Sequence, residues 1–168
     1  IADDERIKII KNKIYKNKEK LIVGISWKSV INIFGKLKSL DIKDFESLFN
    51  DDRLIVNLQY GNIIDDLKYI NSRNKNLCVL NDIDLFNDIE SCIALLKNLD
   101  YFVTVSNSTA HLAGALGVPT ILIVPNKSSS YFYWNTSNRS SIWYNSIKII
   151  TIDDSIKKTM RHVNEIII

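Results

Sequence analysis

Short apolar runs recur along the chain at intervals that fit a sheet of several strands. They lie at residues 21–26, 54–58, 77–80, 101–105, 119–124 and 147–150. The runs at 101–105 and 119–124 do not alternate with polar residues, which is typical of strands that are buried on both faces of a parallel sheet. Pro119 is acceptable there because it stands at the first position of its strand. We therefore expect six strands.

Between these runs, apolar residues fall at helical spacing. The predicted helices cover residues 3–20, 42–49, 62–72, 88–99, 108–116 and 153–167. Asp41 and Asp88 stand where helix caps are expected, and Gly117 is a natural stop for the helix over 108–116. We expect loops over 28–38 and 126–146. Strands that alternate with helices predict an α/β fold, a doubly wound and mostly parallel sheet of the Rossmann-like kind.

The composition is that of an ordinary globular domain and narrows the function classes. The 168 residues are 46% hydrophobic and 24% charged, and the net charge of +3 is too small to indicate nucleic-acid binding. No stretch has the length and apolarity of a membrane span, and no secretory signal is present, so we expect a cytoplasmic protein. Cys78 and Cys92 lack metal or disulfide spacing, and we expect no metal cofactor.

The N-terminal part differs from the rest. Residues 8–20 are the most basic stretch, which fits either a solvated helix face or a docking surface. We divide the chain into an N-terminal helix or linker, 1–20, and a Rossmann-like domain, 21–168. Because the first residue is Ile1 and not Met, we expect the chain to be a piece of a longer protein.

In doubly wound sheets, ligands bind beyond the carboxyl ends of the strands. This rule selects the loops at residues 26–38, 59–62, 81–88, 106–109 and 125–145. The pattern GxGxxG is absent after the first strand, which weighs against a NAD or FAD domain, and GxxxxGK[ST] is absent as well, which excludes a P-loop.

The turn at 106–109 is the most informative of these loops. Its sequence Ser-Asn-Ser-Thr places short polar side chains at the start of a helix, where free amides and a partial positive charge suit a phosphate. Ala110, Ala113, Gly114 and Ala115 would let this helix pack close to the sheet. The alternative is a well-capped helix that binds nothing.

Four segments together resemble a known family. They are GISWK at 24–28, KSLDIKDF at 38–45, LQYG at 58–61 and SNSTAHLAGALGVPTILIVP at 106–125. They are similar to the nucleotide-sugar-binding C-terminal half of GT-B glycosyltransferases, in particular the heptosyltransferase-like glycosyltransferase family 9 and its tetratricopeptide-linked relatives. A Trp-Tyr pair of that family is comparable with Trp143 and Tyr144. The resemblance covers roughly residues 21–150, and the last segment is its specific part.

The resemblance implies a nucleotide diphosphate sugar as ligand and a set of residues that bind it. That set is Ser26, Lys28, Gln59, Asn107, Ser108, Thr109, Ala110 and His111. Ser108, Thr109 and Ala110 would hold the pyrophosphate, Lys28 would add charge, and Gln59 would reach the base or ribose. Each residue also has a purely structural interpretation.

Other residues near the predicted site have two interpretations each. His111 is the one candidate for a catalytic role, as a cation beside a leaving diphosphate, and it fits equally well as a neutral structural histidine. Trp134 and Trp143 would shape a sugar pocket or simply pack. The loop at 81–88 would receive the base, and Asp88 is better explained as a helix cap.

Two departures from the family pattern leave the function open. Asn107 stands where the family usually has Asp, and the loop at 29–38 is short. The general base of a GT-B enzyme normally comes from the N-terminal domain. We expect an N-terminal acceptor domain or a tetratricopeptide region to lie outside this chain. A donor-binding domain of a transferase, a non-catalytic binding or scaffold module, and an epimerase-like enzyme therefore remain as hypotheses; the acceptor, base and sugar are not specified.

Overall fold

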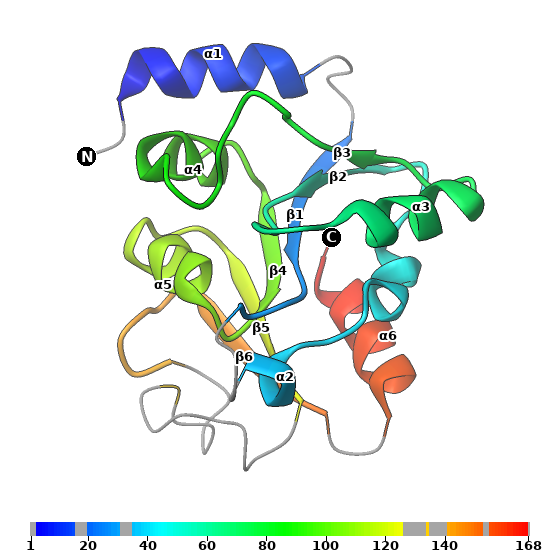
Figure 1. Cartoon of the computed structure of the whole chain (residues 1–168). Coiled ribbons are helices and arrows are strands. Elements are labelled where there is room, and N and C mark those ends of the chain that lie inside the picture. Colours follow the sequence, from blue (N-terminus) through cyan, green and yellow to red (C-terminus); the bar gives the residue numbers. More distant parts are fainter. Residues whose placement is uncertain are drawn as a thin grey trace.

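One parallel sheet of six strands forms the centre of the molecule (Figure 1). The computed structural model describes residues 3–15, 20–30, 35–125, 134, 141–152 and 155–167. The strands are β1 (Leu21–Ser26), β2 (Arg53–Asn57), β3 (Leu77–Cys78), β4 (Tyr101–Val105), β5 (Thr120–Val124) and β6 (Ile147–Thr151). Their order is β3-β2-β1-β4-β5-β6, and every neighbouring pair is parallel. The predicted doubly wound α/β fold is confirmed.

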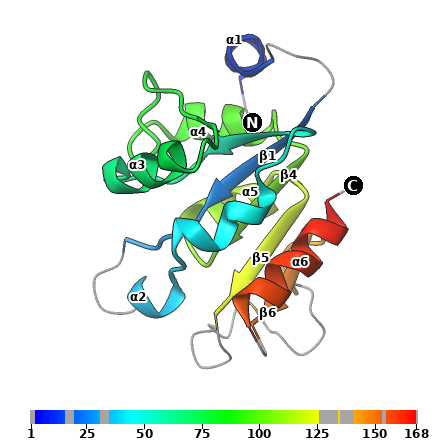
Figure 2. The ribbon, with the colours of Figure 1, turned by 90° about the vertical axis from the view of Figure 1, so that its right-hand side faces the viewer.

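Helices cover both faces of this sheet. They are α1 (Asp4–Ile14), α2 (Gly35–Lys38), the 3₁₀ helix η1 (Ile42–Leu48), α3 (Ile64–Ser72), α4 (Ile89–Leu96), α5 (Ser108–Ala115) and α6 (Ile156–Ile166). Figure 1 shows α4 and α5 on one side of the sheet and α3 and α6 on the other. Figure 2, seen from the side of α6, shows this helix in front of the sheet. The last helix thus returns to the face that η1 and α3 cover.

Each face of the sheet has its own apolar core, because successive side chains of a strand point to opposite faces. On one face Val23, Ile25 and Trp27 pack with residues of η1 and α6. On the other face Ile22 and Phe102 pack with residues of α1 and α4. All five side chains are buried, and each contributes about 1.5–3 kcal/mol by its removal from water.

Three predicted elements differ from those observed. The helix over 42–49 is a 3₁₀ helix, and Asp41 begins it with a capping box that involves Asp44. Within the expected loop 28–38 the chain forms α2, whose four residues are too few to show a helical period. The helix over 3–20 ends at Ile14 in the structure, and residues 16–19 and 153–154 lie outside the described part.

α1 packs on α4 and contacts the loop that follows β3. Ile10 and Ile14 are buried against residues of α4 and the sheet. The Arg6 guanidinium lies 3.0 Å from a carboxylate oxygen of Asp88, the residue that caps α4 as expected. Lys13 forms an ion pair with Asp82. The division of the chain near residue 20 stays a prediction.

α5 approaches its surroundings closely, as its small residues predict. Ala110, Ala113 and Gly114 are buried, whereas Ala115 is exposed, so the expectation that Ala115 faces the sheet was wrong. The helix ends as expected at Gly117, which has a φ of +71°. The amide of Val118 donates to the Ala113 carbonyl over 3.0 Å, which closes a Schellman turn.

Replacement of Gly114 by alanine tests this close packing. A Cβ there would lie 2.4 Å from a ring carbon of Tyr144 and 2.8 Å from Ile147. We expect Gly114→Ala to lower the free energy of unfolding by about 1–3 kcal/mol, although alanine is the better helix former. Urea denaturation measures the change. Ala115→Gly, at the exposed neighbouring position, is the control and costs only the difference in helix propensity, about 1 kcal/mol. A stabilised Gly114→Ala protein would contradict the packing.

Candidate functional site at the carboxyl edge of the sheet

The site lies where the order of the strands reverses. The chain proceeds from β1 outward to β3 and then crosses to β4 on the other side of β1. The loops after β1 and β4 therefore leave in opposite directions, which opens a crevice at the carboxyl edge. Across it, the side-chain amide of Asn107 donates a hydrogen bond of 2.9 Å to the Ser26 hydroxyl. Two predicted site residues thus join the two strand ends.

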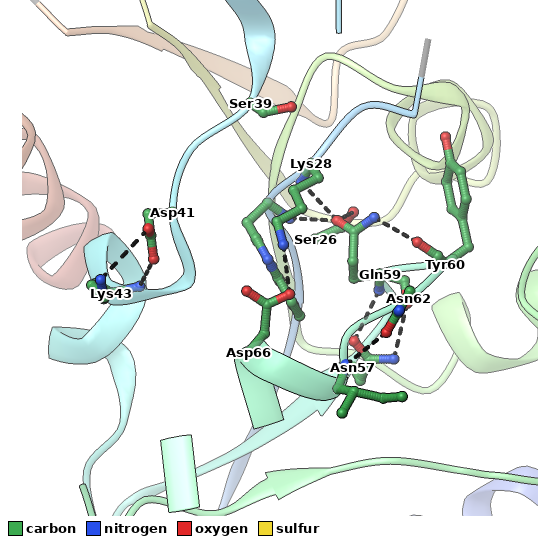
Figure 3. Close-up of polar contacts among 12 residues, drawn as sticks. Ser26, Lys28, Ser39, Asp41, Lys43, Asn57, Gln59, Tyr60, Asn62 and Asp66 are labelled. Carbon is green, nitrogen blue, oxygen red and sulfur yellow. Dashed lines mark hydrogen bonds and ion pairs between the residues drawn. The ribbon is translucent and has the colours of Figure 1, made fainter. Parts of the chain in front are cut away.

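Gln59 connects the ends of β1 and β2. Its Oε1 accepts hydrogen bonds from the Ser26 hydroxyl at 3.1 Å and from the amides of Trp27 and Lys28 at 2.9 and 2.7 Å (Figure 3). Its Nε2 donates to the Tyr60 carbonyl at 2.8 Å. With 2% of its surface exposed, the Gln59 side chain holds the loop after β1 in place and is not itself presented to solvent.

The N-terminus of α5 opens on the same edge. Asn107 caps the helix, since its Oδ1 accepts a hydrogen bond of 3.0 Å from the Ala110 amide. In the described part of the chain, the amides of Ser108 and Thr109 have no hydrogen-bond partner. Ser108 is exposed, whereas Thr109 is buried. The helix therefore begins with two amides that lack a hydrogen-bond partner in the described structure, and its partial positive charge lies beside the exposed Ser108.

His111 is half-buried in an aromatic cluster beside this helix end. Its ring stacks on Trp134 with centroids 4.5 Å apart, and its Nδ1 lies 3.3 Å from the Tyr144 hydroxyl. Burial lowers the pKa of His111, and the positive charge of Lys38 lowers that pKa further. His111 is thus held toward the neutral form. Trp134 is fully buried and donates 2.9 Å to the Ser106 hydroxyl, so it packs as a core side chain.

Lys28 is held by a carboxylate of a neighbouring element. Its Nζ lies 2.6 Å from Oδ2 of Asp66, in the first turn of α3 (Figure 3). The Asp66 side chain is 12% exposed and that of Lys28 is 41% exposed. The ammonium group is therefore paired but still reachable from solvent.

The predicted residues come together, but only some of them reach solvent. All eight lie at or beside the ends of β1, β2 and β4. Lys28, Ser108 and His111 are at least partly exposed. The buried ones are Ser26, Gln59, Asn107, Thr109 and Ala110. The side chains of Ser26, Gln59 and Asn107 make hydrogen bonds within the protein, so their first role is to shape the edge.

Sequence reasoning gave no role to two further residues near the site. These are Lys38 and Asp66, whose positions depend on contacts between distant elements. Tyr144, named in the sequence only as half of a Trp-Tyr pair, lies against His111. Trp143, which the resemblance singled out, is exposed. Most of the loop 125–145 lies outside the described residues. Among those described, no three or more His, Cys, Asp or Glu side chains gather as a metal site would require, and no helix is both long and apolar enough to cross a bilayer.

The lowered pKa of His111 predicts a pH-dependent stability. As the pH falls below 6.5, the ordinary pKa of histidine, the unfolded chain binds a proton that the folded chain does not yet take up. The free energy of unfolding therefore decreases with falling pH, from about pH 6.5 down to the folded pKa. Urea denaturation between about pH 7.5 and pH 5.5 measures this slope. His111→Gln should flatten it, whereas His162→Gln, on the exposed surface of α6, should not. Equal slopes in both variants would contradict the assignment.

Comparison of the sequence with known proteins gives a curated relative. No family model matches the chain. Protein FlbA of Caulobacter vibrioides is 28% identical over 130 residues, which are 70% of this chain and 21% of that protein. The chain thus spans about one fifth of the length of this curated relative.

Two solved structures share the fold over nearly the whole chain. The E. coli ADP-heptose LPS heptosyltransferase II has a TM-score of 0.64 at 15% identity and covers 99% of this chain and 52% of its own. The glycosyl transferase family 9 protein from Veillonella parvula has a TM-score of 0.61 at 11% identity, with 98% and 46% covered. The likeness in fold that the sequence motifs predicted is confirmed: the chain has the fold of about one half of a heptosyltransferase-like glycosyltransferase.

Proposed function

We propose that this chain is the donor-binding part of a glycosyltransferase, which holds a nucleotide diphosphate sugar and stabilises the leaving diphosphate. The observation that carries the proposal is the position of the α5 N-terminus at the strand-order reversal, where the amides of Ser108 and Thr109 have no hydrogen-bond partner in the described structure. Amides fixed in this way stabilise an anion without reorganisation, which is the condition for favouring a departing phosphate.

The charges around α5 fit a leaving group that gains negative charge as the glycosidic bond breaks. Lys28 is a cation at the same edge of the sheet, and burial lowers the pKa of His111, which favours the neutral form of that residue in the free protein. A bound diphosphate raises the pKa of His111 by its own charge. His111 would then donate a proton or a charged hydrogen bond to the diphosphate. These groups supply positive charge from the protein, and we expect no metal.

The nucleoside would extend from α5 toward β3. Three strand steps separate β4 from β3, which is about 14 Å and comparable with an extended nucleoside diphosphate. At that end Tyr60 and Phe86 form an aromatic pair with centroids 5.7 Å apart, and Phe86 is 65% exposed. An exposed ring pair is suited to stack on a nucleobase of any type. The general base and the acceptor site would belong to a second domain.

The alternative is a module that binds but does not catalyse. Asn107 favours it, because its amide is fully engaged with Ser26, Thr104 and the Ala110 amide. It therefore offers neither a carboxylate nor a free polar atom to a sugar. The full-length protein distinguishes the two functions. A transferase that holds a nucleotide sugar releases the nucleoside diphosphate once the acceptor is added, whereas a binding module does not. Binding without hydrolysis or transfer would support the module.

A proline at position 108 tests whether the Ser108 amide binds the diphosphate. Ser108 is the first helical residue of α5 and follows Asn107, whose backbone is extended with φ −148° and ψ 177°. Proline is well accepted there, and it removes the amide hydrogen together with the serine hydroxyl. We expect Ser108→Pro to weaken the binding of ADP, GDP or UDP, whichever binds best, by about tenfold, the value of one charge-assisted hydrogen bond.

Ser108→Ala is the matched control, because it removes the hydroxyl and keeps the amide. Isothermal titration calorimetry measures both variants against the unmodified protein, and circular dichroism checks that α5 persists. The proposal fails when none of the three nucleoside diphosphates or their sugars binds at about millimolar concentration. It also fails if Ser108→Pro binds as tightly as Ser108→Ala.

A further inference from the structure

We propose that Asp66 tunes the affinity of the site for diphosphates by holding the Lys28 ammonium away from α5. This inference rests on the proposed function, since it assumes that a diphosphate occupies the N-terminus of α5. It concerns a residue that no sequence motif indicated. Its basis is the 2.6 Å ion pair between Lys28 Nζ and Asp66 Oδ2 and the positions of the two residues in the sheet.

The topology of the sheet fixes the direction in which Lys28 is drawn. Lys28 follows β1, and Asp66 belongs to α3, which follows β2. β2 and β4 flank β1 on opposite sides, and α5 follows β4. The ion pair therefore directs the Lys28 side chain to the β2 side of β1. Figure 3 shows the side chain running from the strand end toward Asp66.

The main chain of Lys28 is fixed while its side chain remains able to move. The Lys28 amide donates 2.7 Å to Gln59, whose own side chain is buried. The ammonium group ends a flexible stem that is 41% exposed. A change of side-chain rotamers alone would release it from Asp66, with no rearrangement of the loop after β1.

Asp66 is the more rigid partner of the pair. Its side chain is 12% exposed, and it lies in the first turn of α3, where the helix stabilises a negative charge. The preceding residue, Asp65, is 95% exposed and pairs with Lys68 at 3.0 Å instead. Of these two adjacent carboxylates, Asp66 pairs with Lys28 and Asp65 does not.

This arrangement makes Asp66 a competitor of the ligand. While the ion pair persists, the positive charge of Lys28 is largely cancelled at the position of the diphosphate. The charge of Asp66 also repels the anion directly. A diphosphate must therefore attract Lys28 away from Asp66, and removal of the carboxylate charge should make diphosphate binding tighter. A structural ion pair without this role would give no gain in affinity.

The test measures the binding of inorganic pyrophosphate and ADP to the protein by calorimetry. We expect Asp66→Asn to bind both about three- to tenfold more tightly than the unmodified protein, a gain that shrinks with added salt. Asp65→Asn is the matched control, with the same loss of charge one residue away, and should leave the affinity within about twofold. Asp66→Ser is a second variant that keeps a polar residue in the first turn and should show the same gain.

The role of Lys28 is separated by a double-mutant cycle. Lys28→Met should weaken pyrophosphate binding, and the gain from Asp66→Asn should largely disappear when it is made in the Lys28→Met background. The inference is overturned if the unmodified protein binds pyrophosphate and Asp66→Asn and Asp66→Ser bind it no better. An equal gain in Asp65→Asn overturns it as well. Absence of binding in every variant instead removes the proposed function, and the inference with it.

Discussion

The amide oxygen of Gln59 is the contact on which the candidate site depends. It accepts three hydrogen bonds from consecutive residues at the end of β1, at distances of 2.7 to 3.1 Å. One of these donors, Ser26, also accepts from Asn107 after β4. A continuous chain of hydrogen bonds thus joins β2, β1 and β4 at the carboxyl edge. Because these atoms are buried, each lost partner would leave a polar group unsatisfied, so the edge is held in one arrangement.

This network explains why several of the predicted site residues are buried. Ser26, Gln59 and Asn107 make hydrogen bonds to one another's loops, and Thr109 and Ala110 lie against the core. Beside them lie the exposed Ser108 and the partly exposed Lys28 and His111, together with two helix amides that have no hydrogen-bond partner in the described part of the chain. Backbone amides contribute little to a sequence pattern, yet they are the groups that the proposed function assigns to the anion.

The fold was largely predictable from the sequence because its signals are local. Apolar runs marked the strands, Asp41 and Asp88 marked helix starts, and Gly117 marked the end of α5. α2 escaped prediction because four residues show no period. The 3₁₀ geometry of η1 escaped because its apolar spacing also fits an α-helix.

The candidate site was predictable in its place but not in its contacts. The strand-end rule and the Ser-Asn-Ser-Thr turn both indicated this edge, where the structure brings the eight residues together. That a ligand binds there stays a prediction. No local pattern indicates that Asp66 holds Lys28, or that His111 stacks on Trp134, since these partners are 38 and 23 residues apart in the sequence. Long-range pairs of this kind arise only once the sheet is assembled.

α1 connects the N-terminal part of the chain to the loop that follows β3. Arg6 forms an ion pair with Asp88 and Lys13 forms one with Asp82, at the two ends of the loop over residues 82–88. Ile10 and Ile14 of the same helix are buried in the core. A displacement of α1 would therefore act both on two carboxylates of that loop and, through Ile10 and Ile14, on the core around α4. Phe86 lies in the sequence between the two carboxylates that pair with α1, so the position of this exposed ring depends in part on how α1 is held.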